Sequence, residues 1–242
     1  MSGTPAPSPL ACRAILFDLD GTLVDTSQDL WRALNFTIEK RGFPPLEHPQ
    51  VRDFVGHGAR SLLARSFWGK DASPPEPNQD PDFDAALQDF LVHYAAHLAD
   101  HSRPFPQVME TLTQLRQQGF TLGVVTNKPL HLTQSLLDQL AMTHYFTAVV
   151  GGGSLPHYKP DPQPLWHALE IMRISPTLAV MVGDAHPDVA AARAAGCPVV
   201  AVSYGYNSGI PVQELDPDRI VEDFSHLLTQ LVLAPEKGIP SP

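Results

Sequence analysis

The 242-residue sequence contains only two cysteines, Cys12 and Cys197, which lie far apart in the chain. Two separated thiols supply neither a disulfide framework nor a cysteine metal site, and they suit a reducing compartment. No apolar run approaches the roughly 20 residues that cross a bilayer. Residues 1–10 are rich in proline and serine and lack the apolar centre of a signal peptide. We therefore expect a cytoplasmic protein without a membrane partner.

Positive charge is also scarce. Sixteen basic residues stand against 26 acidic ones, which gives a formal net charge of −10. Such a chain repels a nucleic-acid backbone, so nucleic acid is not expected as a stable partner. Hydrophobic residues make up 43% of the chain, enough for one large α/β domain or for a core with a modest second lobe. A small substrate in a local cationic pocket is compatible with this balance.

Residues 14–25 join an apolar run to two carboxylates and a turn. Ala14–Phe17 fits a buried strand, and Gly21 allows the chain to turn sharply. Because side chains two apart project to the same side of a strand, Asp18 and Asp20 should project together. Two such charges need a cation, and Mg²⁺ prefers oxygen ligands that include substrate phosphate. Asp18 could then attack phosphorus while Asp20 passes a proton to the leaving oxygen.

Residues 14–25 could also be a calcium-binding loop or a purely structural turn. A calcium-binding EF-hand loop is excluded by spacing, because glycine comes fourth and the twelfth position is Asp29 instead of glutamate. A purely structural turn stays open when the segment is considered alone.

The hydrophobic periodicity changes character along the chain. Helical spacing recurs from Thr26 to about Arg41, in two short pieces within 50–67, and from Asp82 to His101, and nothing in 25–103 indicates a strand. We therefore predict a small all-helical lobe there. Beyond residue 104 helices alternate with strands. The expected helices cover 107–118, 129–140, 162–172 and 187–195, and the expected strands cover 120–126, 146–150, 178–182 and 199–204.

Together with 14–17, these strands predict a five-stranded parallel sheet with right-handed crossovers and helices on both faces. A closing helix is expected at 223–232. Ligands bind such sheets beyond the carboxyl ends of the strands, and polar residues occur at those ends here. The sequence therefore predicts a site at this edge.

Thr126 and Asn127 end a strand just before a helix whose N–H groups attract anions, so Thr126 suits a phosphoryl oxygen or a strand-end hydrogen bond. Lys159, in a proline-stiffened loop, could offset charge that builds on a nucleophile and on phosphoryl oxygens. Asp184 ends another strand and suits a third acidic metal ligand. Asp188 could contact metal-bound water, position Lys159, or simply favour the start of its helix.

The ordered set of motifs is more specific than any one of them. Asp-x-Asp-Gly-Thr at 18–22, Thr126, Lys-Pro-x-Pro-x-x-Leu at 159–165 and Gly-Asp-x-x-x-Asp at 183–188 resemble the haloacid dehalogenase superfamily. The resemblance extends from about Arg13 to Leu228 and is greatest to its bacterial phosphoglycolate phosphatases.

This resemblance implies a Mg²⁺-dependent phosphatase that hydrolyses 2-phosphoglycolate through a phosphoaspartyl intermediate. It makes Asp18 the nucleophile and a metal ligand, and Asp20 the acid/base and a metal ligand through its backbone carbonyl. Thr126 would bind phosphate, Lys159 would neutralise charge, and Asp184 would hold Mg²⁺. The dehalogenases of the superfamily lack the second carboxylate of the first motif, so Asp20 favours phosphate chemistry.

The resemblance also implies a division of the chain. A Rossmann-like catalytic core would comprise 11–24 and 104–235, and a helical cap at 25–103, inserted after the first strand, would select the substrate. Residues 1–10 and 236–242 would be tails. Ala185 departs from the family pattern, since relatives commonly carry Ser or Thr there.

Phosphoglycolate carries a carboxylate besides its phosphate, so its site needs an extra cation or exposed N–H groups. The candidates are Arg65, Arg60 and Lys128, in falling order, together with Gly58 in the cap loop. Surface arginines would explain the first two equally well.

Other functions stay open at this point. The partner is expected to be a small phosphorylated metabolite, but the same core could serve a sugar-phosphate or pyrophosphate hydrolase or a phosphohexomutase. A receiver-like switch also phosphorylates an aspartate at a strand end with Mg²⁺. The sequence leaves open whether the protein is a monomer or a homodimer.

Overall fold

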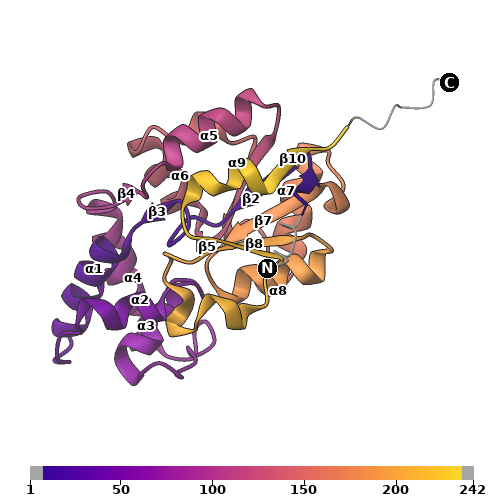
Figure 1. The fold of residues 1–242 in the computed structure, drawn as a ribbon. Helices are drawn as coiled ribbons and strands as arrows, with labels where there is room; N and C mark the ends of the chain where they lie inside the picture. Colours follow the sequence, from indigo (N-terminus) through magenta and orange to yellow (C-terminus); the bar gives the residue numbers. More distant parts are fainter. Residues whose placement is uncertain (1–7, 236–242) are drawn as a thin grey trace, which may run out of the picture.

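The computed structural model describes residues 8–235 (Figure 1). The expected tail at 236–242, and most of the one at 1–10, lie outside this range. A parallel sheet flanked by helices confirms the expected α/β class, although the sheet has six strands instead of five. In spatial order these are β6 (Ala148–Gly152), β5 (Thr121–Pro129), β2 (Ala14–Phe17), β7 (Ala179–Gly183), β8 (Val199–Val202) and β9 (Arg219–Val221).

The central strand β2 is buried throughout because helices cover both faces of the sheet. Ile15 and Phe17 belong to one hydrophobic cluster, and Ala14 and Leu16 belong to the other. Each cluster is completed by helices from its own side of the sheet, as Figure 1 shows. These are α5 (Val108–Gln117) and α6 (Leu130–Gln139) on the first side and α7 (Gln163–Met172) and α8 (His186–Ala195) on the second.

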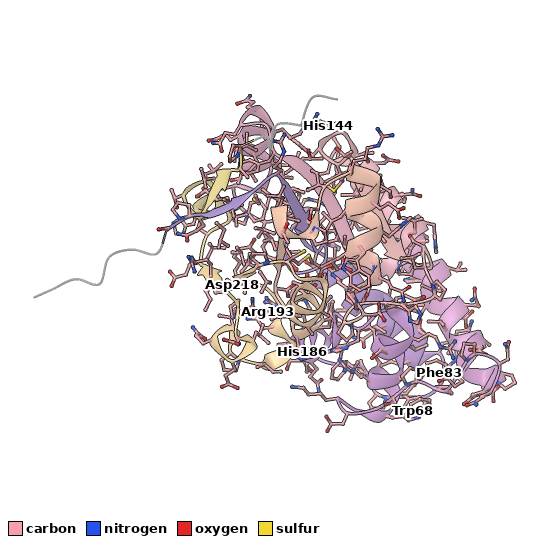
Figure 2. All side chains as sticks on the ribbon, turned by 90° about the vertical axis from the view of Figure 1, so that its right-hand side faces the viewer. Trp68, Phe83, His144, His186, Arg193 and Asp218 are labelled. Carbon is pink, nitrogen blue, oxygen red and sulfur yellow. The ribbon has the colours of Figure 1, made fainter. Side chains whose placement is uncertain are left out.

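The sixth strand, β9, was not predicted because it has only three residues and two of them are not buried. Hydrogen bonds to Asp218, the residue just before β9, fix the position of this strand. Asp218 accepts hydrogen bonds from Arg193 Nη1 and from the N–H of Val199, each at 2.7 Å. Figure 2 shows Arg193 and Asp218 side by side on this part of the core. The edge strand therefore depends on partners that are distant in sequence.

The prediction of a helix at 223–232 is wrong for its last residues, which form a strand. A 3₁₀ turn and the short helix α9 (Leu227–Gln230) lead into strand β10 (Leu231–Leu233), which pairs in parallel with β1 (Leu10–Cys12). By its sequence alone, the short apolar run Leu231–Leu233 is compatible with a helix or with a strand. Its pairing with β1 makes it a strand.

The segment 26–102 forms a layer of helices beside the carboxyl edge of the sheet (Figure 1). The chain leaves and re-enters the core through two short antiparallel strands, β3 (Val24–Asp25) and β4 (Arg103–Pro104). The helices are α1 (Ser27–Glu39), α2 (His48–Phe54), α3 (Ala59–Trp68) and α4 (Pro81–Ala96). None of the helices in residues 8–235 has the length and apolar character needed to cross a membrane.

Candidate active site

The site lies where three neighbouring strands end beneath the helical layer. Asp18 follows β2, Thr126 and Lys128 lie near the end of β5, and Asp184 follows β7. The Asp18 N–H donates to the Val182 carbonyl at 2.9 Å, which continues the pairing of β2 with β7 up to the first carboxylate. The polar strand ends predicted from the sequence thus meet at one edge.

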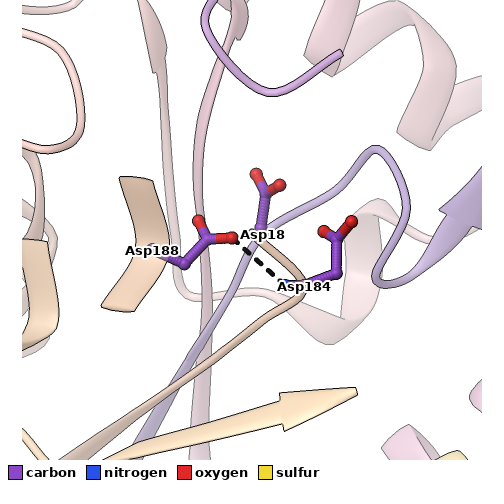
Figure 3. Close-up of side chains that lie close together, drawn as sticks. All are labelled: Asp18, Asp184 and Asp188. Carbon is purple, nitrogen blue, oxygen red and sulfur yellow. Dashed lines mark hydrogen bonds between the residues drawn. The ribbon is translucent and has the colours of Figure 1, made fainter. Parts of the chain in front are cut away.

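Three buried carboxylates gather at this edge. Oxygen atoms of Asp18, Asp184 and Asp188 all lie within 4.8 Å of one another. Figure 3 shows the three side chains directed into a common space. Burial, together with the charges of Asp188 and Asp18, raises the pKa of Asp184 to about 8. A cluster of hard oxygen donors whose negative charges repel one another suits a divalent cation such as Mg²⁺.

Hydrogen bonds from the surrounding loops hold these carboxylates in place. Asp188 Oδ2 accepts from the N–H groups of Asp184 at 3.2 Å and Ala185 at 3.0 Å. Asp184 accepts from the Thr22 hydroxyl at 2.9 Å and from the Tyr206 N–H at 2.8 Å. Hydrogen bonds from the loops after β2 and β8 therefore orient the carboxylate of Asp184, which itself follows β7.

Lys159 brings the positive charge of the cluster. Its Nζ donates to Asp18 at 2.9 Å, to Asp188 at 2.6 Å and to the Val125 carbonyl at 2.6 Å. Burial alone would lower the pKa of Lys159, but the charges of Asp18 and Asp188 outweigh it and raise that pKa. The lysine therefore stays protonated beside the expected nucleophile.

Asn127 fixes the Lys159 loop and reaches the helical layer. Its side chain accepts from the Lys159 N–H at 2.9 Å and donates to the Lys159 carbonyl at 2.9 Å and to the Gly56 carbonyl at 3.0 Å. Thr126 Oγ1 accepts the Lys128 N–H at 3.3 Å. One side chain thus joins the charged loop of the core to the layer above it.

Asp20 is separate from the acidic cluster. Its Oδ1 accepts from the Thr26 hydroxyl at 2.8 Å and from Lys128 Nζ at 3.1 Å. The expectation that the side chains of Asp18 and Asp20 share one cation is therefore wrong, because the turn at Gly21 directs the second carboxylate toward Lys128.

A cavity of about 40 Å³ lies between the core and the helices above it. Asp18, Asp20, Thr126, Asn127 and Lys128 form its polar side. The opposite side is largely apolar and comes mainly from α3, α4 and the loop before α3.

Only some of the candidate residues for substrate selection line the cavity. Lys128 and Gly58 line the cavity, as do Ala59 and Leu62 on one face of α3. Arg60 lies about 100° around that helix from Ala59. It bonds to Asp84 and to the Pro75 carbonyl, each at 2.7 Å. The expectation for Arg60 is therefore wrong, because its guanidinium is engaged on another face of the layer.

Arg65 is not among the residues that line the cavity. Its Nη1 donates to the Phe54 carbonyl at 3.3 Å, and its Nε is buried without a partner among the described residues. Of the three cationic candidates, Lys128 is thus the one that lines the cavity. Burial and the nearby charges of Arg65 and His186 lower the pKa of His57 to about 4, so this loop imidazole is neutral at neutral pH. Figure 2 shows His186 on the side of the core that adjoins the helical layer.

Two tyrosines of the site were not identified from the sequence. Tyr94 accepts a hydrogen bond from Lys128 Nζ at 2.6 Å, but its place in the apolar stripe of α4 indicated only core packing. The Tyr206 hydroxyl donates to Asp25 at 2.9 Å and accepts from the Thr26 N–H at 2.8 Å. Tyr206 thus links the Asp184 loop to the start of the helical layer, a connection that depends on loops far apart in sequence.

We expect Gly205→Ala to damage the acidic cluster. A Cβ built at Gly205 clashes with Cβ of Asp184, whose backbone cannot yield without moving the carboxylate. Overpacking of this kind costs about 1–3 kcal/mol. Urea unfolding measures the loss of stability, and the metal concentration for half-maximal activity should rise. The control is Gly153→Ala, where nothing lies within 4 Å and only the positive φ is unfavourable. An unchanged metal requirement in Gly205→Ala would contradict the expectation.

Comparisons with known proteins agree with the geometry of the site. The model of the haloacid dehalogenase-like hydrolase family matches residues 15–202. A phosphoglycolate phosphatase of Thiobacillus denitrificans is 38% identical over 213 residues, which are 88% of this chain and 92% of the relative. One from Caulobacter vibrioides is 43% identical over 210 residues, or 87% and 86% of the two chains. The crystal structure of a predicted phosphoglycolate phosphatase from Haemophilus somnus has a TM-score of 0.82 at 36% identity and covers 90% of this chain and 96% of that one.

Proposed function

Because this chain belongs to the haloacid dehalogenase-like hydrolase family, we propose that it hydrolyses 2-phosphoglycolate to glycolate and phosphate in a Mg²⁺-dependent reaction with a phosphoaspartyl intermediate. The family and the named relatives make the chain a phosphoric monoester hydrolase. The substrate of the proposal comes from the names of those relatives and from the small cavity with a lysine in its wall.

The observation that carries the proposal is the contact of Asp18 with Lys159 inside the acidic cluster. A carboxylate oxygen at a strand end lies 2.9 Å from an ammonium group, and the same carboxylate lines the cavity. Asp18 and Asp184, with the backbone carbonyl of Asp20, would hold Mg²⁺. The bound ion would supply positive charge against the phosphoryl oxygens and the carboxylates.

In the first proposed step, Asp18 attacks phosphorus. A bond forms between its carboxylate oxygen and phosphorus, while the bond from phosphorus to the ester oxygen breaks. Asp20 acts as the general acid that gives a proton to the departing oxygen. Lys159 and the Thr126 hydroxyl bind the negative charge that builds on the phosphoryl group and on Asp18.

In the second step, water attacks phosphorus, and the bond between phosphorus and the Asp18 oxygen breaks as inorganic phosphate forms. Asp20 accepts the proton of that water, so both carboxylates return to their starting states. An acid/base group beside the nucleophile favours rapid turnover over the long-lived phosphorylation of a receiver-like switch.

The helical layer at 25–103 is proposed as the cap that selects the substrate, and 11–24 with 104–235 as the catalytic core. The paired strands β3 and β4, where the chain passes between the two, support this division. A cytoplasmic setting is part of the proposal, and the two free, buried cysteines, Cys12 and Cys197, are consistent with it.

Phosphate release from 2-phosphoglycolate tests the proposal. With Mg²⁺ we expect a preference for this ester over sugar phosphates and pyrophosphate. A chelator should reduce the rate by about 100-fold or more, since the acidic groups lose the charge that offsets them, and added Mg²⁺ should restore it. Hydrolysis that is indifferent to chelation would overturn the metal requirement, and equal rates on all esters would overturn the substrate.

A further inference from the structure

Lys128 carries the positive charge that faces the cavity. It is the only cationic residue among those that line the cavity in the described part of the chain, and only 6% of it is exposed. Its Nζ lies 3.1 Å from Asp20 Oδ1, 3.3 Å from Asp20 Oδ2 and 2.6 Å from the Tyr94 hydroxyl. The lysine ammonium is a compact charge with three rotatable donors, so a carboxylate that enters the cavity can take the place of one of the two contacts with Asp20.

The surroundings of Lys128 make this charge selective. The apolar lining of the cavity includes Leu62, Phe90, Leu91 and Leu132, which offer no charge to an entering group. A negative group that enters such a space loses water and gains little unless it meets a cation. Conversely, a neutral group beside Lys128 gains no ionic interaction with its ammonium group.

The two lysines of the site serve different acidic groups. Lys159 donates to Asp18, and Lys128 donates to Asp20. Under the proposed function Asp20 protonates the departing oxygen, so the part of the substrate beyond that oxygen lies next to Lys128. In 2-phosphoglycolate this part is a carboxylate one carbon away from the ester oxygen.

We propose that Lys128 selects substrates whose leaving group carries a carboxylate, and that Tyr94 positions it for this task. This inference rests on the proposed function and deepens it, because it names the residue that recognises the non-phosphate end of the substrate. Lys128 belongs to the binding site, whereas Tyr94 acts through Lys128.

Tyr94 holds the ammonium in two ways. Its hydroxyl accepts a hydrogen bond from Nζ, and Nζ also lies 4.5 Å from the centre of its ring. Burial raises the pKa of Tyr94 well above its usual range, so the phenol stays neutral beside the lysine. Since Tyr94 lies on α4 and Lys128 on β5, the lysine is positioned only while the helical layer covers the site.

The selectivity ratio tests this inference. We would measure kcat/KM with Mg²⁺ for 2-phosphoglycolate and for 2-hydroxyethyl phosphate, a similar ester with a neutral end. Lys128→Met should reduce the preference for the carboxylate ester by about 100-fold, because a site built for one polar group strongly rejects its loss. Any general damage to Asp20 affects both esters and cancels in the ratio.

Lys40→Met is the matched control. Lys40 pairs with Asp89 at 2.9 Å on the surface, where its side chain is 57% exposed. Exposed pairs contribute little, so the ratio should change by less than about twofold.

Each outcome separates the inference from the proposed function. If the wild type shows no preference between the esters, the assignment of phosphoglycolate fails. If the wild type prefers phosphoglycolate and Lys128→Met keeps that preference, the role of Lys128 fails while the activity stands. Should circular dichroism show that Lys128→Met is unfolded, Tyr94→Phe decides. It retains the ring and loses the hydroxyl, so the ratio should fall by about tenfold. An unchanged ratio would overturn the inference.

Discussion

Asp18→Asn is expected to reduce phosphate release by about 10⁴-fold or more, as is typical when a nucleophile is removed. An amide oxygen does not form the acyl phosphate that a carboxylate forms. The fold should remain, because the new side chain can still accept the hydrogen bond that Lys159 donates to Asp18 at 2.9 Å. Asp18 also raises the pKa values of Asp184 and Asp188 by its charge. Removing that charge should leave the metal-free protein at least as stable as the wild type.

Two measurements distinguish a lost nucleophile from a damaged fold. Mass spectrometry of rapidly quenched reactions should find a phosphoryl group on the peptide that contains Asp18 in the wild type and none in the variant. Urea unfolding should give equal or higher stability for the variant. The matched control is Asp100→Asn, an identical chemical change at a side chain that is 56% exposed and bonded to His97. A variant that releases phosphate within about tenfold of the wild-type rate would show that Asp18 is not the nucleophile.

The sequence predicts the centre of this fold well because the necessary information is local there. The apolar run Ala14–Phe17 is buried on both faces, and such a run identifies a central parallel strand without knowledge of its neighbours. Carboxyl ends of parallel strands share one edge, so Asp18, Thr126 and Asp184 could be expected together before any contact was known.

Other features depend on contacts between distant segments, and local patterns do not specify them. Leu231–Leu233 is a strand only because Leu10–Cys12 lies beside it. The direction of Arg60 depends on which face of α3 covers the core, since a rotation of about 100° per residue separates neighbouring side chains. Tyr94 occupies an apolar stripe, and its hydroxyl acquires a role only through Lys128, 34 residues further along the chain.

Lys159→Met is expected to affect both turnover and stability. The side chain of Lys159 is 1% exposed and pairs with Asp18 at 2.9 Å and with Asp188 at 2.6 Å. Removing one partner of a buried ion pair costs about 3–5 kcal/mol, because the remaining charges stay buried without compensation. The loss of a charge that stabilises the reacting phosphoryl group should reduce kcat by about 10²–10³-fold. Urea unfolding without metal and steady-state phosphate release measure the two effects.

A double variant tests whether the instability comes from the unpaired carboxylates. In Lys159→Met with Asp188→Asn, one buried negative charge is removed, and the amide oxygen can still accept from the N–H groups of Asp184 and Ala185. Much of the lost stability should return while turnover stays low, since two groups in contact act non-additively. Mg²⁺ should also stabilise the single variant more than the wild type, because its acidic groups lack their internal cation. Equal stability of the single and double variants would mean that Lys159 contributes by packing alone, and its place in the charge balance of the site would have to be abandoned.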